Sequence, residues 1–473
     1  MRWYLRLNIN EQRRACRTPR YYNYRTTWFG VDMSGSEPRK DGMKRLVLCL
    51  DGTWNTPEAD EITNIVHIRN LIDPKFKDSA DEIVIQRVYY ESGVGTGGIK
   101  LQRLLQGATG AGLEDNVRGA YRFLSSIYRA DLDIYIFGFS RGAFTARSLA
   151  GYIGASGLLK PEHCTFENEG RAWTYYRTVP KFRFPSDRRA LDEISFENVR
   201  IKALGVFDTV GSRGIPISGV LNWYNEKYYG FHDVTLGSNV DHAFHALAID
   251  EKRLAFPASV WQYPNHKENK SVEQVWFAGN HANIGGGYSD ASLSAIALKW
   301  MLSRIESLGL GLQFVPDWQK RLTLNPLGPV YDERKRLLYS TGGLPSTVRI
   351  INQCPANVSG RKAGLPRHAI PIGEMLHWTA LHRRDDAGLG YRPPNLESAI
   401  AAMEAGTHLM PIVGNSSRPL YWFNNKEDRD ELFPQLSPRM RDRLARVVAN
   451  LKDADVPLSS QEEAKLQATK QVS

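Results

Sequence analysis

The sequence predicts an α/β fold with a mostly parallel central sheet and helices on both faces. Short apolar runs, rich in β-branched and aromatic residues, alternate with longer stretches that carry apolar residues at helical spacing. Several of these runs are apolar throughout, as expected of parallel strands that are buried on both faces. Polar or glycine-rich segments follow the runs directly, and an open parallel sheet places its functional loops at those strand ends.

The predicted elements alternate along the first two thirds of the chain. We expect strands at 45–50, 83–90, 134–137, 199–207 and 272–278, and helices at 62–71, 113–128, 143–153 and 293–308. Two aromatic-rich segments, 154–196 and 215–231, are predicted as irregular insertions. They could form a lid or acyl-chain pocket, or pack as a small core of their own.

Four segments are expected from the pattern over the 473 residues. Residues 1–42 form a basic, flexible extension, and 43–310 form the catalytic domain. Residues 311–425 form a C-terminal subdomain packed on that domain, and 426–473 form a helical tail with a frayed end. The helix in the tail is expected to begin at Ser437-Pro438, because proline suits a first helical turn.

Composition narrows the class of protein. The net charge is +10, and residues 1–42 hold nine Arg and Lys against four Asp and Glu. This excess suits an anionic surface such as a membrane, although solubility alone would also account for it. No apolar run approaches the length of a membrane span, and the first thirty residues lack a secretory signal. We therefore expect a cytoplasmic protein, with export independent of a signal peptide left open.

The four cysteines argue against structural metal or disulfide chemistry. They lie far apart and include no C-x-x-C pair, at positions Cys16, Cys49, Cys164 and Cys354. This spacing disfavours both a zinc site and a disulfide framework. The glycine-rich run at 93–98 lacks the register of a phosphate-binding loop, so no nucleotide site is expected.

Residues 138–142, GFSRG, are the strongest functional motif. They form a G-x-S-x-G between a predicted buried strand and a predicted helix. In a nucleophile elbow the serine occupies a strained turn that exposes its hydroxyl above the sheet, and small neighbours relieve crowding there. The context therefore predicts Ser140 as a nucleophile, and not only a glycine-rich turn that happens to contain serine.

Two further residues follow predicted strands. Asp208 ends the strand at 199–207, and His281 lies on a glycine-rich loop after the strand at 272–278. Ser140, Asp208 and His281 thus fall at the carboxyl ends of successive predicted strands. Because the carboxyl ends of parallel strands share one edge, the three residues can converge there. Their order is that of the α/β-hydrolase plan, so an α/β-hydrolase-like fold with a Ser-Asp-His triad is expected.

Rivals exist for two triad members. His377 is the alternative base, whereas His242 and His245 look structural; Asp290 and Asp51 are alternative acids. No cofactor or metal is required by this chemistry.

Two loops are expected to form the oxyanion hole. The amide of Arg141, directly after the nucleophile, is one candidate donor. The second is the amide of Gly52 or Thr53, in the loop after the first strand. The alternative for that loop is an Asp-Gly turn capped by Asn55.

Six motifs in the same order resemble an uncharacterised α/β-hydrolase family that includes type VI secretion phospholipase effectors of the first class. They are LCLDGTWN (48–55), YYESGVGTG (89–97), GFSRGAFTAR (138–147), GVFDTVGS (205–212), HALAIDEKRLAF (245–256) and WFAGNHANIGGGY (276–288). The resemblance covers about residues 43–310 and implies Ser140, Asp208 and His281 as the triad. Where the family commonly has His-Ser-Asp, this chain has His281-Ala282-Asn283, and the uncharged Asn283 can only hydrogen-bond.

The resemblance implies hydrolysis of lipid or phospholipid acyl esters, and secretion-system or immunity-type protein partners. An anionic membrane surface is a further expected partner, and no nucleic acid is expected. Two alternatives stay open: an esterase or thioesterase for a soluble substrate, and a catalytically degenerate binding or delivery module.

Overall fold

The computed structural model describes residues 42–52, 61–92, 111–210, 236–254, 256–261, 268–332, 346–351, 373–404 and 412–414. The predicted basic extension, the insertion at 215–231 and the C-terminal tail lie outside these residues. Within them, no helix combines the length and apolar character needed to cross a bilayer.

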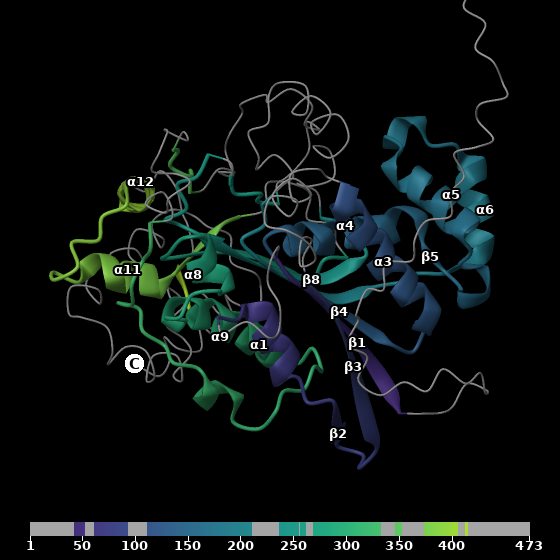
Figure 1. Cartoon of the computed structure of the whole chain (residues 1–473), viewed down its shortest axis with the longest axis horizontal. Coiled ribbons are helices and arrows are strands. Elements are labelled where there is room, and N and C mark those ends of the chain that lie inside the picture. Colours follow the sequence, from purple (N-terminus) through teal and green to yellow (C-terminus); the bar gives the residue numbers. More distant parts are fainter. Residues whose placement is uncertain are drawn as a thin grey trace, which may run out of the picture. The chain divides into compact units, whose positions relative to one another are not determined.

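A nine-stranded sheet forms the centre of the fold (Figure 1), in the order β11-β10-β9-β8-β7-β4-β1-β3-β2. Its strands are β1 (Met43–Leu50), β2 (Lys75–Lys77), β3 (Ile83–Glu91), β4 (Asp133–Phe139), β7 (Ile201–Phe207), β8 (Val240–Ala248), β9 (Ser271–Phe277), β10 (Met375–His377) and β11 (Ile412–Val413). All the strand pairs are parallel except β2 with β3. The predicted α/β fold with a mostly parallel sheet is therefore confirmed.

One central strand was not predicted. β8, VDHAFHALA, lies between β7 and β9 and is buried along its whole length. Its histidines and aspartate interrupt the apolar run that marks a buried strand in the sequence. The expectation that Asp208 and His281 end successive strands is thus wrong, because β8 separates β7 from β9.

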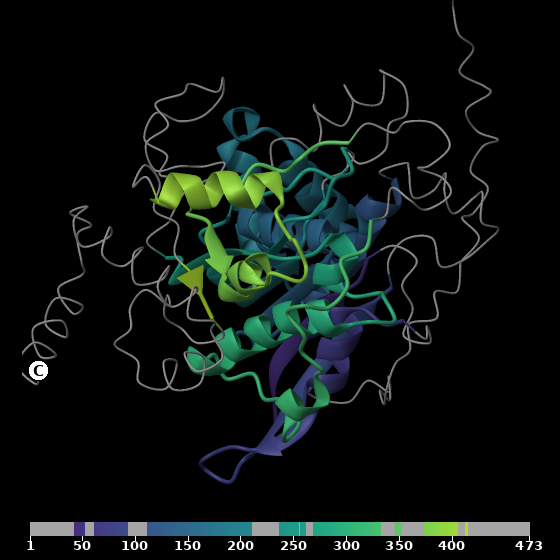
Figure 2. The same ribbon diagram turned by 90° about the vertical axis from the view of Figure 1, so that its left-hand side faces the viewer.

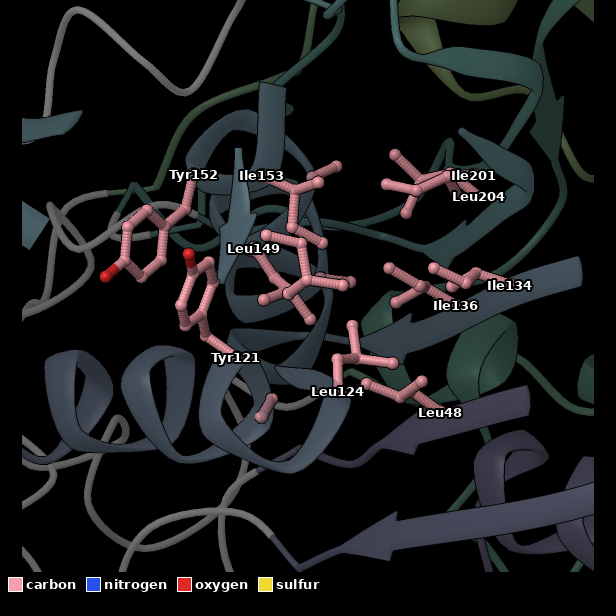
Figure 3. Packing of buried hydrophobic residues seen from close by; sticks show 14 of the residues in the cluster. Leu48, Tyr121, Leu124, Ile134, Ile136, Leu149, Tyr152, Ile153, Ile201 and Leu204 are labelled. Atoms are coloured by element: carbon pink, nitrogen blue, oxygen red, sulfur yellow. The ribbon is translucent and has the colours of Figure 1, made fainter. Parts of the chain in front are cut away.

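Helices cover both faces of the sheet. They are α1 (Asn64–Leu71), α3 (Ala111–Ile127), α4 (Arg141–Ser156), α5 (Phe166–Arg177), α6 (Pro185–Ile194), α8 (His281–Gly285), α9 (Ser292–Ser307), α11 (Trp378–Asp385) and α12 (Pro394–Glu404). Alternate residues of each strand point to opposite faces. Leu46 and Leu48 accordingly pack into one core with α3 and α4, whereas Val47 and Cys49 pack into the other with α1 and α9. Figure 3 shows the first core, where Leu124 and Leu149 meet Leu48 and Ile136.

The first aromatic insertion is helical, so the prediction of an irregular segment at 154–196 is wrong. Thr165 caps α5 by accepting a hydrogen bond from the amide of Asn168. Trp173 and Tyr176 of α5 then pack around Tyr152 of α4, with ring centroids 5.1 and 5.2 Å away. These two side chains belong to the main core. The helix that carries them was not predicted because tertiary packing stabilises it, and that packing is not visible in the sequence pattern.

The C-terminal part of the described chain extends the sheet. β10 pairs with β9, and α11 and α12 lie at the front of Figure 2, on the side away from α5 and α6. Leu376, Trp378 and Leu396 pack there with Trp276 of β9. The segment predicted as a C-terminal subdomain therefore contributes two strands, β10 and the edge strand β11, to one side of the central sheet.

Candidate active site

Ser140 lies at a strained turn between β4 and α4. Its φ is 58° and its ψ is −121°, a conformation that residues with a side chain rarely adopt. The amide of Ser140 donates to the carbonyl of Phe207, and its carbonyl accepts from the amide of Phe144 in the first turn of α4. The turn therefore links the sheet to the helix without an intervening loop.

The two glycines of the G-x-S-x-G motif permit this turn. A Cβ atom on Gly142 would lie 2.1 Å from the carbonyl oxygen of Leu50, and one on Gly138 would lie 2.5 Å from the carbonyl oxygen of Gly142. Both distances are to backbone atoms, which cannot move aside as a side chain would. Glycine is required because α4 begins in contact with β1.

His281 begins a short helix, so the prediction that it lies on a loop is wrong. The side chain of Asn280 accepts from the amide of Asn283, and the side chain of Asn283 accepts from the amide of Asn280. The side-chain Nδ2 of Asn283 also donates to the backbone carbonyl of Pro329, 3.2 Å away. Asn283 thus holds the turn that carries His281, and it makes one contact that an aspartate could not make.

The three predicted triad side chains meet at the carboxyl edge of the sheet. His281 Nε2 lies 2.8 Å from Ser140 Oγ, and His281 Nδ1 lies 2.6 Å from Asp208 Oδ2. Asp208 is fully buried and Ser140 is 9% exposed. The arrangement can transfer a proton from the hydroxyl to the imidazole while the carboxylate holds the Nδ1–H tautomer.

Burial and charge act on the two titratable groups in opposite ways. Burial lowers the pKa of the His281 imidazole, and the hydrogen bond that its Nδ1–H donates to Asp208 offsets this only in part. Burial by itself would raise the pKa of the Asp208 carboxyl, but the charge of Arg349 and the hydrogen bond of His281 outweigh it and hold that pKa below its usual range. A neutral imidazole beside an ionised carboxylate is the protonation state that a general base needs.

The alternative residues lie in other environments. Asp51 accepts from Thr63 Oγ1 and Tyr90 Oη, and Asp290 accepts from the amide of Ser292. His377 Nδ1 lies 2.8 Å from Thr379 Oγ1, and its ring stacks on Phe277. Among the described residues, Asp208 is the acid that the structure brings to His281.

His242 and His245, the two histidines expected to be structural, are buried residues of β8. His242 Nδ1 lies 2.8 Å from Ser271 Oγ. His245 Nε2 accepts from the amide of Thr209, which directly follows Asp208. Burial lowers the pKa of His245 well below its ordinary value, so its neutral ring supports the loop that carries Asp208.

The predicted oxyanion donors are placed only in part. Arg141 is the first residue of α4, whose amino-terminal end suits a negative charge. The amide of Gly52 donates to Asp51 Oδ1 at 2.6 Å, so it would have to leave that carboxylate before binding an oxyanion. Thr53 and Asn55 lie outside the described residues, and these oxyanion roles stay predictions.

Two residues near the triad were not predicted. Arg349 contacts Asp208 through both of its terminal nitrogens. Glu251 Oε2 accepts from the backbone amide of His281 at 3.3 Å and forms a two-bond ion pair with Arg253. The motif HALAIDEKRLAF contained Glu251 and Arg253 as a signal, whereas nothing in the sequence around Arg349 distinguished it from the other arginines.

The described part of the chain contains no cluster suited to a metal ion, and a cavity lies close to the triad. No three His, Cys, Asp or Glu side chains there converge to hold a metal ion. A cavity of about 210 Å³ borders Glu251, Arg253 and Tyr331, but Ser140 and His281 do not line it.

The chain belongs to the family described as T6SS, Phospholipase effector Tle1-like, catalytic domain, which matches residues 44–304. This match spans β1 to α9 and contains all three residues of the predicted triad. A family of phospholipase effectors is consistent with a hydrolase that acts on lipid esters.

This chain spans less than two thirds of the length of each of three relatives. The uncharacterized protein YEL023C of Saccharomyces cerevisiae is 30% identical over an alignment of 236 residues, and the match covers 45% of this chain and 32% of that protein. The structure of the Tle1 effector bound to the VgrG spike from the Type 6 secretion system has 19% identity and a TM-score of 0.31, covering 58% of this chain and 56% of that one. An uncharacterized protein from Pseudomonas aeruginosa has 16% identity and a TM-score of 0.33, covering 90% and 62%. At such low TM-scores, the fold class is established by the sheet and the family match instead.

Proposed function

We propose that this protein is a serine hydrolase that cleaves carboxylic esters, with lipid or phospholipid acyl esters as its substrates. The observation that carries the proposal is the continuous hydrogen-bonded chain from Ser140 through His281 to Asp208. Membership of a phospholipase effector family supports the lipid substrate.

The reaction proceeds through an acyl-enzyme. Ser140 Oγ attacks the ester carbonyl while His281 Nε2 takes its proton, and Asp208 stabilises the imidazolium. The tetrahedral oxyanion is stabilised by backbone amides, for which Arg141 and either Gly52 or Thr53 are the candidates. His281 then protonates the leaving alcohol. Water, deprotonated by the same histidine, releases the acid and restores Ser140, so that one water is consumed for each ester cleaved.

Partners other than substrate remain predictions. The Tle1 effector in the solved structure is bound to the VgrG spike, and a comparable secretion-system partner is proposed for this chain. An immunity-type protein is proposed as a partner because of the family. An anionic membrane surface is proposed because the chain has a net charge of +10. The relative from yeast is a reason to test the esterase activity independently of any secretion role.

The first test compares wild type with Ser140→Ala on a short p-nitrophenyl ester and on phospholipid vesicles. We expect the variant to lose about 10⁴-fold or more in kcat on whichever ester is cleaved, because the nucleophile is absent. Activity on the short ester alone would retain the mechanism and exclude the membrane substrate. Equal turnover by wild type and Ser140→Ala on both substrates would contradict the triad and favour a binding module.

A further inference from the structure

Arg349 is fully engaged in hydrogen bonds around the carboxylate of Asp208. Nη1 donates to Asp208 Oδ1 at 2.6 Å and to the carbonyl of Ala248 at 3.1 Å. Nη2 donates to Asp208 Oδ2 at 3.0 Å and to the carbonyl of Phe256 at 2.8 Å, and Nε donates to the same carbonyl at 3.1 Å. A guanidinium has five N–H donors, and all five have acceptors here.

The carboxylate of Asp208 is equally occupied. Its Oδ1 accepts from Arg349 and from the amide of Ala248, 3.0 Å away. Its Oδ2 accepts from Arg349 and from His281 Nδ1. The plane of this carboxylate is therefore set by three hydrogen bonds besides that of the imidazole, two from Arg349 and one from the amide of Ala248.

The backbone holds Arg349 in this position. Ser346 forms an isolated antiparallel bridge with Arg253, and the amide of Thr347 donates to the carbonyl of Lys252 at 2.9 Å. Ile351 packs in the core around Trp276 and Leu376. A short segment far from the triad in sequence is thus attached to the chain that follows β8, and this attachment directs Arg349 at Asp208.

A second ion pair lies on the other side of His281. Arg253 pairs with Glu251, which accepts from the amide of His281, and the Arg253 guanidinium lies 3.8 Å from the centroid of the Phe256 ring. The Phe256 ring packs against the imidazole of His281 in a T-shaped arrangement, with the ring centroids 5.1 Å apart. Within the described residues, the carboxylates that contact His281 are those of Asp208 and Glu251, each paired with one arginine, and the charge of Arg253 also acts on the imidazole.

We propose that Arg349 is a positioning residue of the triad, which fixes the carboxylate plane of Asp208 and balances its charge. This role rests on the proposed serine-hydrolase function. Because the negative charge of Asp208 is balanced, it favours the protonated imidazole less than an unpaired carboxylate would. His281 consequently stays neutral down to a lower pH than it would beside an unpaired carboxylate, and it can accept the Ser140 proton over that range.

The test measures kcat and KM against pH on a short p-nitrophenyl ester for wild type, Arg349→Met and Arg349→Lys. In Arg349→Met we expect the acid limb of kcat/KM to move to higher pH by about one unit, because an opposite charge near Asp208 has been removed. We also expect kcat to fall about 10- to 100-fold with KM little changed. A loss of this size is typical when a residue that only orients an active-site side chain is removed.

Arg349→Lys keeps the charge but not the two parallel hydrogen bonds. The acid limb of kcat/KM should stay where it is in wild type, whereas kcat should fall. If Arg349→Met does not fold, Arg349→Lys is the variant that tests the proposal. Arg304→Met is the matched control, because Arg304 also forms a buried two-bond ion pair, with Glu273, but away from the triad. Thermal melting of each variant shows which of them are folded at the assay temperature.

The outcomes separate the two proposals. Wild type that neither cleaves the ester nor is labelled at Ser140 by a fluorophosphonate overturns the triad and the role of Arg349 with it. Active wild type with an unshifted acid limb in folded Arg349→Met, or with full kcat in Arg349→Lys, overturns the role of Arg349 alone. A change in Arg304→Met equal to that in Arg349→Met would overturn it as well, since any buried ion pair would then have the same effect.

Discussion

At the scale of single residues, the proposed site joins a strained serine to a histidine and an aspartate that are held by their surroundings. Ser140 and Asp208 both have positive φ, at 58° and 39°. Backbone strain of this kind persists only where neighbouring contacts over-determine the conformation. Here the strand ladder fixes the amide of Ser140, while Ala248, His281 and Arg349 fix the side chain of Asp208.

The pH dependence of activity follows from the state of His281. The imidazole must be neutral to accept a proton, and burial lowers its pKa below the ordinary value of 6.5. Activity is therefore present above that lowered pKa and is lost as the pH falls through it. We expect the acid limb of kcat/KM for a short ester to have its midpoint below 6.5. The pKa of Asp208 is also lowered, so this carboxylate stays ionised across the same limb.

Acid unfolding has to be separated from this limb. Samples held at each pH and returned to neutrality should recover full activity if titration of His281 alone is responsible. A reversible limb centred at or above 6.5 would contradict the burial argument.

At the scale of elements, the close contact between α4 and β1 determines what residue 142 can be. We expect Gly142→Ala to destabilise the protein by about 2 kcal/mol or more, because the new Cβ would overlap the backbone of Leu50 and Asp51. Gly170→Ala is the control, since Gly170 lies within α5 with no atom within 4 Å of an added Cβ. That change should stabilise by about 0.5–1 kcal/mol, because alanine is the better helix former. Urea denaturation of both variants checks the contrast, and equal stabilities would contradict it.

A second element-scale feature concerns how a bilayer substrate would be reached. In the described part of the chain, the exposed phenylalanines are Phe166, Phe182 and Phe184, at 85%, 63% and 68% exposure, and all three belong to the first insertion. Phe182 and Phe184 follow the last turn of α5, where Arg177 pairs with Glu114 in the first turn of α3. Because α3 leads back to the start of β4, its first turn lies toward the carboxyl edge that carries Ser140. Phe166 begins the opposite end of α5.

We therefore expect Phe182→Ser with Phe184→Ser to reduce hydrolysis of vesicles severalfold, since exposed aromatic side chains partition into the bilayer interface. Turnover of the short ester should not change. Phe166→Ser is the matched control, and it should leave both activities near wild type. An equal loss of vesicle activity in Phe166→Ser would show that no particular end of the insertion faces the bilayer.

At the scale of the whole molecule, charge is the property most relevant to a membrane substrate. The chain carries 61 Lys and Arg against 51 Asp and Glu. We expect hydrolysis of anionic vesicles to fall as salt shortens the Debye length to about 3 Å, because the attraction is screened. Hydrolysis of a neutral short ester should be insensitive to the same salt. If zwitterionic and anionic vesicles respond alike, net charge has no part in substrate binding.

The whole sheet also explains which features could be predicted from sequence. Runs such as RLVLCL and IYIFGF identify their strands because residues buried on both faces must be apolar. β8 was missed because its His242 and His245 are polar, and their burial depends on partners in Ser271 and Thr209 that only the fold supplies. The helices α5 and α6 were missed for a related reason, since their packing on α4 is invisible in a short window of sequence.

The sequence by itself determined the fold class and the order of Ser140, Asp208 and His281 along the chain. Apolar periodicity and the G-x-S-x-G spacing are local properties, and each can be recognised within a few residues, whereas the contact with Leu50 that requires glycine at 142 is made only in the fold. Only the tertiary structure decided the neighbours of those groups: Arg349 on Asp208, Glu251 at the amide of His281, and Asp51 at the amide of Gly52. Hydrogen bonds and ion pairs act over a few ångströms in space, and residues 141 positions apart, as Asp208 and Arg349 are, come within that range only through the fold.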